Sequence, residues 1–265
     1  LNAIGIVTEK YNTTCPFVEK VWNRSEVIAK KEYTIVIHGK PSHEETRATF
    51  SHAAANAPSV VVKDMKEAEL LASFITGERT AEEFYHAFNG QYSAGFDARL
   101  HLKKLGVVNQ TTMLASDTQA IADYLRKIIT IHTGDPASFA DTRDTLCYAT
   151  NDNQTAVSGM LETPADLAIV VGGYNSSNTS HLVELCELRL PTYYISSADK
   201  LISREKITHF NFHTKEELNS SGYLPDKSPV HILITSGASC PDAMVEAVIS
   251  KLLSYFPGTY SMEKI

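Results

Sequence analysis

The sequence predicts an α/β protein in which short parallel strands alternate with helices. A repeated pattern is the first indication: a short β-branched run, then a loop rich in Ser, Thr, Asn or Gly, then the apolar spacing of a helix. It recurs after Ile37, Val108, Val171 and Ile234. Size is the second indication, since a chain of 265 residues with 43% hydrophobic content can bury more than one core. Such alternation is typical of parallel sheets, whose loop ends converge along one edge.

The individual elements follow from local composition. Expected strands cover the β-branched runs 4–7, 33–37, 59–62, 105–108, 169–171, 192–196 and 231–235. Expected helices follow Pro16, Met65, Asp117, Leu182 and Pro241, where apolar residues recur at helical spacing. A further strand-to-helix junction is expected at Cys147, with the helix opening at 151–154. Residues 80–105 have the mixed pattern of an insertion, and residues 203–229 are predicted to be irregular and polar.

Composition excludes several classes of protein. The formal net charge is −7 and the longest run of Lys or Arg is a pair, which argues against a nucleic-acid partner. No apolar stretch is long enough to cross a bilayer, and no signal peptide follows Leu1, so we expect a soluble protein without a membrane partner.

The loop after Val171 is the strongest candidate for ligand binding. It offers hydroxyls and amides but no charge, in the run Asn175 to Ser180, directly before a predicted helix. Helix N-termini at the carboxyl ends of parallel strands present free N–H groups to anions. The same residues also serve as ordinary helix caps and turn formers, and composition alone does not decide between the two interpretations.

The four cysteines are far apart in the sequence, without a C-x-x-C pair. This spacing excludes a zinc finger, and we expect no disulfide framework in a chain of this size without an export signal. Cys15 precedes Pro16 at an expected helix start, where the helix dipole favours a thiolate, and Cys147 repeats that setting. Both are either structural residues or ligands that meet only in the fold, whereas Cys186 is expected in a core.

Several of these loops together resemble one family, the 4-hydroxy-3-methylbut-2-enyl diphosphate reductases, also called LytB or IspH. The matching segments, in the family's order, are TTCPFVEKVW (13–22), HGKPSHEETRAT (38–49), NQTTM (109–113), DTLCYATNDNQ (144–154), NSSNTSHL (175–182) and TSGASCPD (235–242). Because they span almost the whole chain in order, the resemblance is far more specific than any single motif.

The resemblance implies an arrangement of three α/β domains related by approximate threefold symmetry around a central iron–sulfur site. In the family, three cysteines hold a 4Fe–4S cluster, and the fourth iron is open to substrate. Cys15 and Cys147 match two of the three ligand positions, since thiolates are the usual ligands of such clusters. Cys240 stands where the family often has Ala or Thr, and it is not assigned as a ligand.

The same resemblance implies roles for the polar loops. Glu45 takes the proton-delivery position, and Thr111 relays the proton to the substrate hydroxyl. The residues at positions that hold the substrate are His43, Thr111, Ser176, Ser177, Asn178 and Ser239.

The implied reaction is the last step of the non-mevalonate (MEP/DOXP) pathway of isoprene biosynthesis. It is a reductive dehydroxylation that gives isopentenyl and dimethylallyl diphosphates, with ferredoxin or flavodoxin as electron donor. The resemblance favours the bacterial cytoplasm over the plastid stroma as the location.

The chain departs from the family at its start, where the family has a domain that carries the third cysteine. We therefore expect residues 1–14 to be the remnant of a missing first domain, residues 15–145 and 146–250 to be the second and third domains, and residues 251–265 to be a tail. On this view the sequence is a fragment or a truncated reading frame, and the chain alone would not turn over. The main alternative is a non-redox module that binds a diphosphate or another anion without a cluster. A conventional α/β hydrolase or transferase is less well supported, since G-x-S-x-G, P-loop and G-x-G-x-x-G motifs are absent from the sequence.

Overall fold

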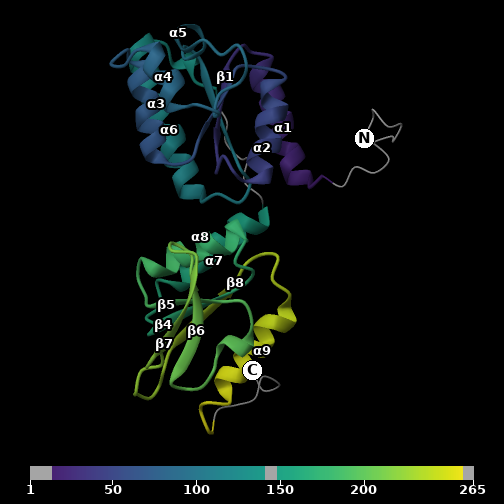
Figure 1. Cartoon of the computed structure of the whole chain (residues 1–265), viewed down its shortest axis with the longest axis vertical. Coiled ribbons are helices and arrows are strands. Elements are labelled where there is room, and N and C mark those ends of the chain that lie inside the picture. Colours follow the sequence, from purple (N-terminus) through teal and green to yellow (C-terminus); the bar gives the residue numbers. More distant parts are fainter. Residues whose placement is uncertain (1–13, 141–147, 259–265) are drawn as a thin grey trace, which may run out of the picture. The chain divides into compact units, whose positions relative to one another are not determined.

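The computed structural model describes residues 14–140 and 148–258, and the chain divides into two compact units, Leu1–Tyr148 and Ala149–Ile265. Each unit has a three-stranded parallel sheet with helices on both faces (Figure 1). The predicted α/β fold with short parallel sheets is thereby confirmed. The strand expected at 4–7 lies outside the described residues.

In the first unit the sheet has the order β2-β1-β3. The strands are β1 (Thr34–His38), β2 (Ser59–Val62) and β3 (Leu105–Asn109). The helices are α1 (Pro16–Ala29), α2 (Glu44–Ala54), α3 (Met65–Ile75), α4 (Ala81–Ala87), α5 (Ala98–His101) and α6 (Ala115–Thr133), followed by the 3₁₀ turn Pro136–Ser138. Every residue of the three strands is buried, because the helices cover both faces of the sheet.

The two faces of this sheet have separate cores. Val21 and Ile28 of α1 pack with Ile35 and Ile37 on one face. Leu71 of α3 and several residues of α6 pack with Val36 and Val107 on the other. Alternate strand residues therefore point to opposite helical layers, as the pleat of a strand requires.

In the second unit the sheet has the order β5-β4-β8. The strands are β4 (Leu167–Val171), β5 (Thr192–Ile195), β6 (Lys206–Asn211), β7 (Glu216–Ser221) and β8 (Ile232–Ser236). The helices are α7 (Tyr148–Met160), α8 (Ser177–Glu187) and α9 (Asp242–Leu253), with a 3₁₀ turn at Ala198–Lys200. Within the ranges that the structure describes, none of the helices combines the length and apolar character needed to span a bilayer.

Three expectations about this unit were wrong. The helix expected from Leu182 begins at Ser177 (α8), so Ser177 to Ser180, expected in a loop, are helical. Residues 203–229, expected to be irregular, contain the antiparallel hairpin β6–β7. Strand β7 is polar and almost wholly exposed, and a 2.7 Å hydrogen bond from Thr208 Oγ1 to Asn219 Oδ1 joins it to β6, so β7 carries no apolar strand signal. In addition, α7 begins at Tyr148 rather than at 151–154, and Asn151 and Asp152 are exposed helix residues instead of a cap.

The two units repeat the same design at the strand ends. A loop of five residues joins β1 to α2 (39–43) and β4 to α8 (172–176), and both helices are 11 residues long. The registers also match, since His38 pairs with Asn109 and Val171 pairs with Ser236 at the last positions of the strands. Glu45 and Asn178 are therefore the second residues of equivalent helices.

Candidate functional site

The centre of the first unit's site is the contact between Glu45 and Thr111. Thr111 lies two residues beyond the carboxyl end of β3, and Glu45 lies in the first turn of α2. The Thr111 backbone N–H donates to Glu45 Oε1 at 2.5 Å, and the Thr111 hydroxyl donates to Glu45 Oε2 at 3.0 Å. Both carboxylate oxygens are thus held by one residue, at the edge of the sheet where parallel α/β proteins bind ligands.

His43 caps the helix that carries Glu45. Its Nδ1 accepts the backbone N–H of Glu45 at 3.2 Å, which satisfies one of the free donors at the helix start. This bond fixes Nδ1 as the unprotonated ring nitrogen in neutral His43, so that Nε2 carries the hydrogen and can donate to an anion. The three predicted residues His43, Glu45 and Thr111 therefore lie together in one unit.

In the second unit the equivalent helix start is formed by Ser176, Ser177 and Asn178. Ser176 Oγ caps α8 by accepting the backbone N–H of Thr179 at 3.2 Å. Asn178 is 5% exposed, and among the described residues neither its Oδ1 nor its Nδ2 has a hydrogen-bond partner. A buried amide without a partner is rare, and it indicates a ligand, an ion or a bound water.

Two glycines let the strand ends approach this helix. A Cβ atom at Gly237, directly after β8, would overlap the Thr179 hydroxyl, and one at Gly172 would lie 2.8 Å from it. Ser239 follows two residues later in the same loop and is exposed. The loops after β4 and β8 are thus in contact through Thr179, a residue that was not predicted to have a role.

The β6–β7 hairpin packs against the loop that leads into α8, through contacts with Tyr174. The rings of Tyr174 and Phe210 are stacked with their centroids 4.3 Å apart, and the Tyr174 hydroxyl donates to Glu217 Oε1 at 3.0 Å. Hydrogen bonds from Lys200 and Tyr174 lower the pKa of the Glu217 carboxyl, and burial raises the pKa of Tyr174. Sequence reasoning missed this contact because the hairpin itself was not predicted.

The cysteines differ in accessibility. Cys15 is exposed at the N-cap of α1, and in the described part of the chain its thiol makes no capping hydrogen bond. Cys186 is fully buried, as predicted, and burial raises the pKa of its thiol to about 12. Burial also raises the pKa of the half-buried Cys240. Cys147 lies outside the described residues. Among the described residues, no group of three or more His, Cys, Asp or Glu side chains could hold a metal ion.

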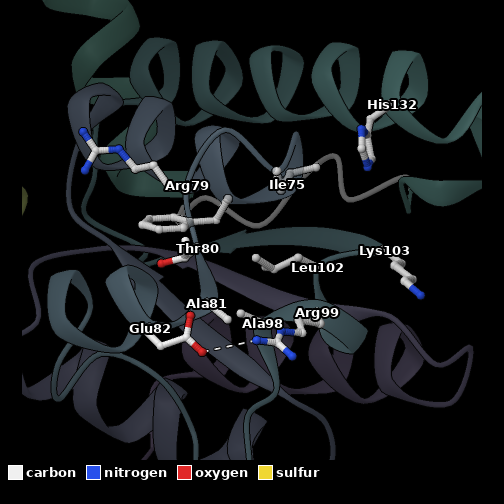
Figure 2. Close-up of a pocket in the computed structure, with 12 residues that line it drawn as sticks. Ile75, Arg79, Thr80, Ala81, Glu82, Ala98, Arg99, Leu102, Lys103 and His132 are labelled. Atoms are coloured by element: carbon white, nitrogen blue, oxygen red, sulfur yellow. Dashed lines mark hydrogen bonds and ion pairs between the residues drawn. The ribbon is translucent and has the colours of Figure 1, made fainter.

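The cavity drawn in Figure 2 lies at a different edge of the first unit. It has a volume of about 380 Å³ and is lined by the end of α3, the starts of α4 and α5, and His132 near the end of α6. Arg99 faces Glu82 across it at 3.2 Å, whereas Arg79 points away from that pair. Leu102 and Lys103 precede β3, so this cavity is near the amino end of the strand whose carboxyl end leads to Thr111.

Fold and site together define an α/β protein with repeated units, each of which presents polar side chains on a helix start beside its strand ends. A family model described as LytB protein matches residues 4–253, and the chain belongs to this family. The resemblance inferred from the sequence is thereby confirmed.

Among similar proteins, 4-hydroxy-3-methylbut-2-enyl diphosphate reductases from Cyanothece sp. and Trichodesmium erythraeum are 40% and 39% identical over 92% of this chain. A chloroplastic enzyme of that name from Botryococcus braunii is 43% identical over 90% of this chain. The chain spans 60%, 60% and 48% of these relatives' lengths, respectively.

A solved structure has the same fold. It is that of E-1-hydroxy-2-methyl-but-2-enyl-4-diphosphate reductase from Plasmodium falciparum, with a TM-score of 0.59 and 23% identity. The match covers 94% of this chain and 61% of that one.

Proposed function

We propose that the protein to which this chain belongs reduces 4-hydroxy-3-methylbut-2-enyl diphosphate to isopentenyl and dimethylallyl diphosphates. The reaction takes up two electrons and two protons, breaks the allylic C–O bond and releases water. The observation that carries the proposal is the pair of hydrogen bonds from Thr111 to the two carboxylate oxygens of Glu45. Family membership and the names of the relatives support it.

In this proposal Glu45 and Thr111 deliver the proton that leaves with the hydroxide. The backbone N–H of Thr111 keeps Glu45 Oε1 occupied, so the transferable proton resides on Oε2. When Oε2 is protonated, it donates to the Thr111 hydroxyl, whose own hydrogen is then free to point at the substrate oxygen. The threonine thus relays the proton without carrying a charge, which suits a side chain that is 5% exposed.

We assign the diphosphate to hydrogen-bond donors. The start of α8 supplies backbone N–H groups, the hydroxyls of Ser176 and Ser177 and the buried amide of Asn178, and Ser239 and His43 add a hydroxyl and an imidazole. Fixing the diphosphate at these groups orients the allylic C–O bond for cleavage.

The implied cofactor is a 4Fe–4S cluster, which when bound supplies the two electrons one at a time. Cys15 fits a ligand role, because its thiol is exposed at the N-cap of α1 and, in the described part of the chain, makes no capping hydrogen bond. We propose Cys147 as the second ligand and expect the third outside this chain.

Three further proposals accompany the reaction. Residues 15–145 and 146–250 are proposed as the second and third of three domains, and residues 1–14 as the end of the first. Ferredoxin or flavodoxin is proposed as electron donor. The bacterial cytoplasm is proposed as the location, in line with the bacterial relatives.

The test is Glu45→Gln in a longer protein that includes the first domain. We expect turnover to fall by about 10²–10⁴, the usual contribution of a general acid, with unchanged cluster absorption. The matched control is Glu44→Gln, since Glu44 is the neighbouring carboxylate and forms an ion pair with the exposed Arg47 at 3.1 Å. A near-wild-type rate in Glu45→Gln would remove this residue from the mechanism.

Anaerobic reconstitution with iron and sulfide separates the proposal from a non-redox anion-binding module. A reductase takes up iron and develops the brown absorption of a cluster, and Cys15→Ser lowers that uptake. A colourless protein that still binds pyrophosphate would favour the module.

A further inference from the structure

Gln110, the residue between β3 and Thr111, is fully buried and ties three segments of the first unit together. Its Oε1 accepts the Thr46 hydroxyl at 2.9 Å and the backbone N–H of Lys40 at 3.1 Å. Its Nε2 donates to the Thr112 hydroxyl at 2.6 Å. The amide thus joins the loop after β1, the first turn of α2 and the loop after β3.

These partners are the chain neighbours of the acid and its relay. Thr46 follows Glu45 in α2, and Gln110 precedes Thr111. Two contacts therefore join the same pair of segments: Thr111 bonds to Glu45, and Gln110 bonds to Thr46. Because each contact constrains the backbone of the other, loss of the Gln110 bonds frees Thr111 to move relative to the carboxylate.

The close packing around Gln110 leaves little room for adjustment. A Cβ atom at Gly39 would lie 2.5 Å from Thr46 Oγ1 and 3.0 Å from Gln110 Cβ. In the second unit the position equivalent to Gln110 is Gly237, which brings no side chain, and the helix there carries Asn178 instead of an acid. In the described part of the chain, the unit that has a carboxylate at the helix start therefore also has the hydrogen-bonded amide of Gln110, and the other unit has neither.

We propose that Gln110 is a positioning residue that holds Thr111 at hydrogen-bonding distance from both oxygens of Glu45. This rests on the proposed function insofar as Glu45 is the acid. Gln110 acts through its neighbours, since both lone pairs of Oε1 are already engaged by Thr46 and Lys40. Its contribution is geometric: it fixes the distance over which the proton moves, and a displacement of about 1 Å at a reacting centre lowers a rate by about a hundredfold.

The first measurement needs no activity. The chain is labelled with ¹⁵N-threonine, and the Thr111 amide is assigned with Thr111→Ser. An N–H that donates to a carboxylate resonates downfield of an amide without such a partner, and we expect Gln110→Ala to move this signal upfield. The matched control is Gln91→Ala, which removes a half-buried amide with two hydrogen bonds in the same unit, to Val61 and Glu67, and leaves the Thr111 signal in place.

The second measurement is kinetic and uses the longer protein with its cluster. We expect Gln110→Ala to lower kcat by about tenfold to a hundredfold with KM changed less than about twofold, because only transition-state geometry is lost. Should Gln110→Ala fail to fold, Thr46→Val, which removes one hydroxyl donor at constant shape, should show the same changes at smaller amplitude.

The two measurements test the positioning role of Gln110 and the proposed reductase function separately. An unmoved Thr111 signal in Gln110→Ala and Thr46→Val overturns the positioning role, as does a kcat that matches that of Gln91→Ala. An inactive wild-type protein overturns the proposed function alone, and the Thr111 signal then decides whether Gln110 holds the contact.

Discussion

Gly39→Ala should destabilise the first unit through a steric clash. The backbone of Gly39 is outside the left-handed region, so alanine is allowed there, but its Cβ would lie 2.5 Å from Thr46 Oγ1 and 3.2 Å from Thr46 Cγ2. Overpacking costs about 1–3 kcal/mol, and breaking the Thr46–Gln110 hydrogen bond adds about 1 kcal/mol. Reduced unfolded-state entropy offsets about 0.4–1 kcal/mol, which leaves a net loss of roughly 1–3.5 kcal/mol.

The sequence has one tryptophan, Trp22, which lies in the first unit, so its fluorescence can measure the loss of stability of that unit. Trp22 of α1 donates to Thr49 of α2 at 3.2 Å and stacks on His52 of the same helix at 5.0 Å, so its fluorescence reports the packing of α1 on α2. We expect the urea midpoint of the Trp22 transition to fall by about 1 M. Gly159→Ala in α7 is the control, since its Cβ would meet no atom within 4 Å and should not move this transition.

A double mutant identifies the cause. Thr46→Ala removes two of the three atoms that the new Cβ would meet and leaves Gln110 Cβ at 3.0 Å, so Gly39→Ala should cost less in that background, with a coupling energy of about 1–2 kcal/mol. If the two substitutions are additive within about 0.5 kcal/mol, contact between residues 39 and 46 is not the source of the loss. An unchanged midpoint for Gly39→Ala would mean that the space around Gly39 accommodates a methyl group without a clash.

Two further predictions concern the pH dependence of the second unit. Burial raises the pKa of the Cys186 thiol from 9.0 to about 12. The stability that the buried neutral thiol contributes is therefore complete below pH 9 and is lost as the pH rises toward 12. Cys186→Ala should make the alkaline decline in the urea midpoint shallower, and an unchanged slope would contradict this. Lys200 and Tyr174 lower the pKa of Glu217 from 4.5, so the stability from this contact is present above pH 4.5 and is lost as the pH falls through the lowered value. Glu217→Gln should therefore flatten the acid limb of unfolding followed by circular dichroism, and an equally steep limb in the variant would exclude this contact as its source.

The sequence was sufficient to predict the α/β fold and much of the first unit's site. The loops that carry Glu45 and Thr111 follow strands that pair with each other, and parallel strands bring their carboxyl ends to one edge. A cap in the run Asn175 to Ser180 was also predictable in kind, because serine favours the N-cap, whereas the cap at His43 was not, since histidine is not a preferred N-cap residue.

What the sequence could not predict depends on tertiary contacts. Strand β7 is polar and almost wholly exposed, so it lacks the alternation by which half-buried strands are recognised. Gln110 forms hydrogen bonds with Thr46 and Lys40, which lie 64 and 70 positions away from it in the sequence. Nothing in the local sequence indicates that this glutamine is buried. The fit of Thr179 against Gly172 and Gly237 is likewise visible only when two strand ends are side by side.

The buried amide of Asn178 allows a direct test of ligand binding at the start of α8. Its amide is buried, yet in the described ranges neither polar atom is paired, and an unsatisfied buried group costs about 1–3 kcal/mol. Asn178→Leu removes that penalty at similar volume and adds helix propensity, so we expect the second unit to become about 1–2 kcal/mol more stable while pyrophosphate binding weakens.

Asn153→Leu is the matched control. Asn153 lies in α7 of the same unit, and its amide donates to the Ser236 carbonyl at 3.2 Å, so removing it should not stabilise the unit. Urea unfolding by circular dichroism and calorimetric titration with pyrophosphate measure the two effects separately. A loss of stability in Asn178→Leu would mean that the amide already has its partner within the protein. A stabilised variant with unchanged pyrophosphate affinity would mean that this helix start is not where the anion binds.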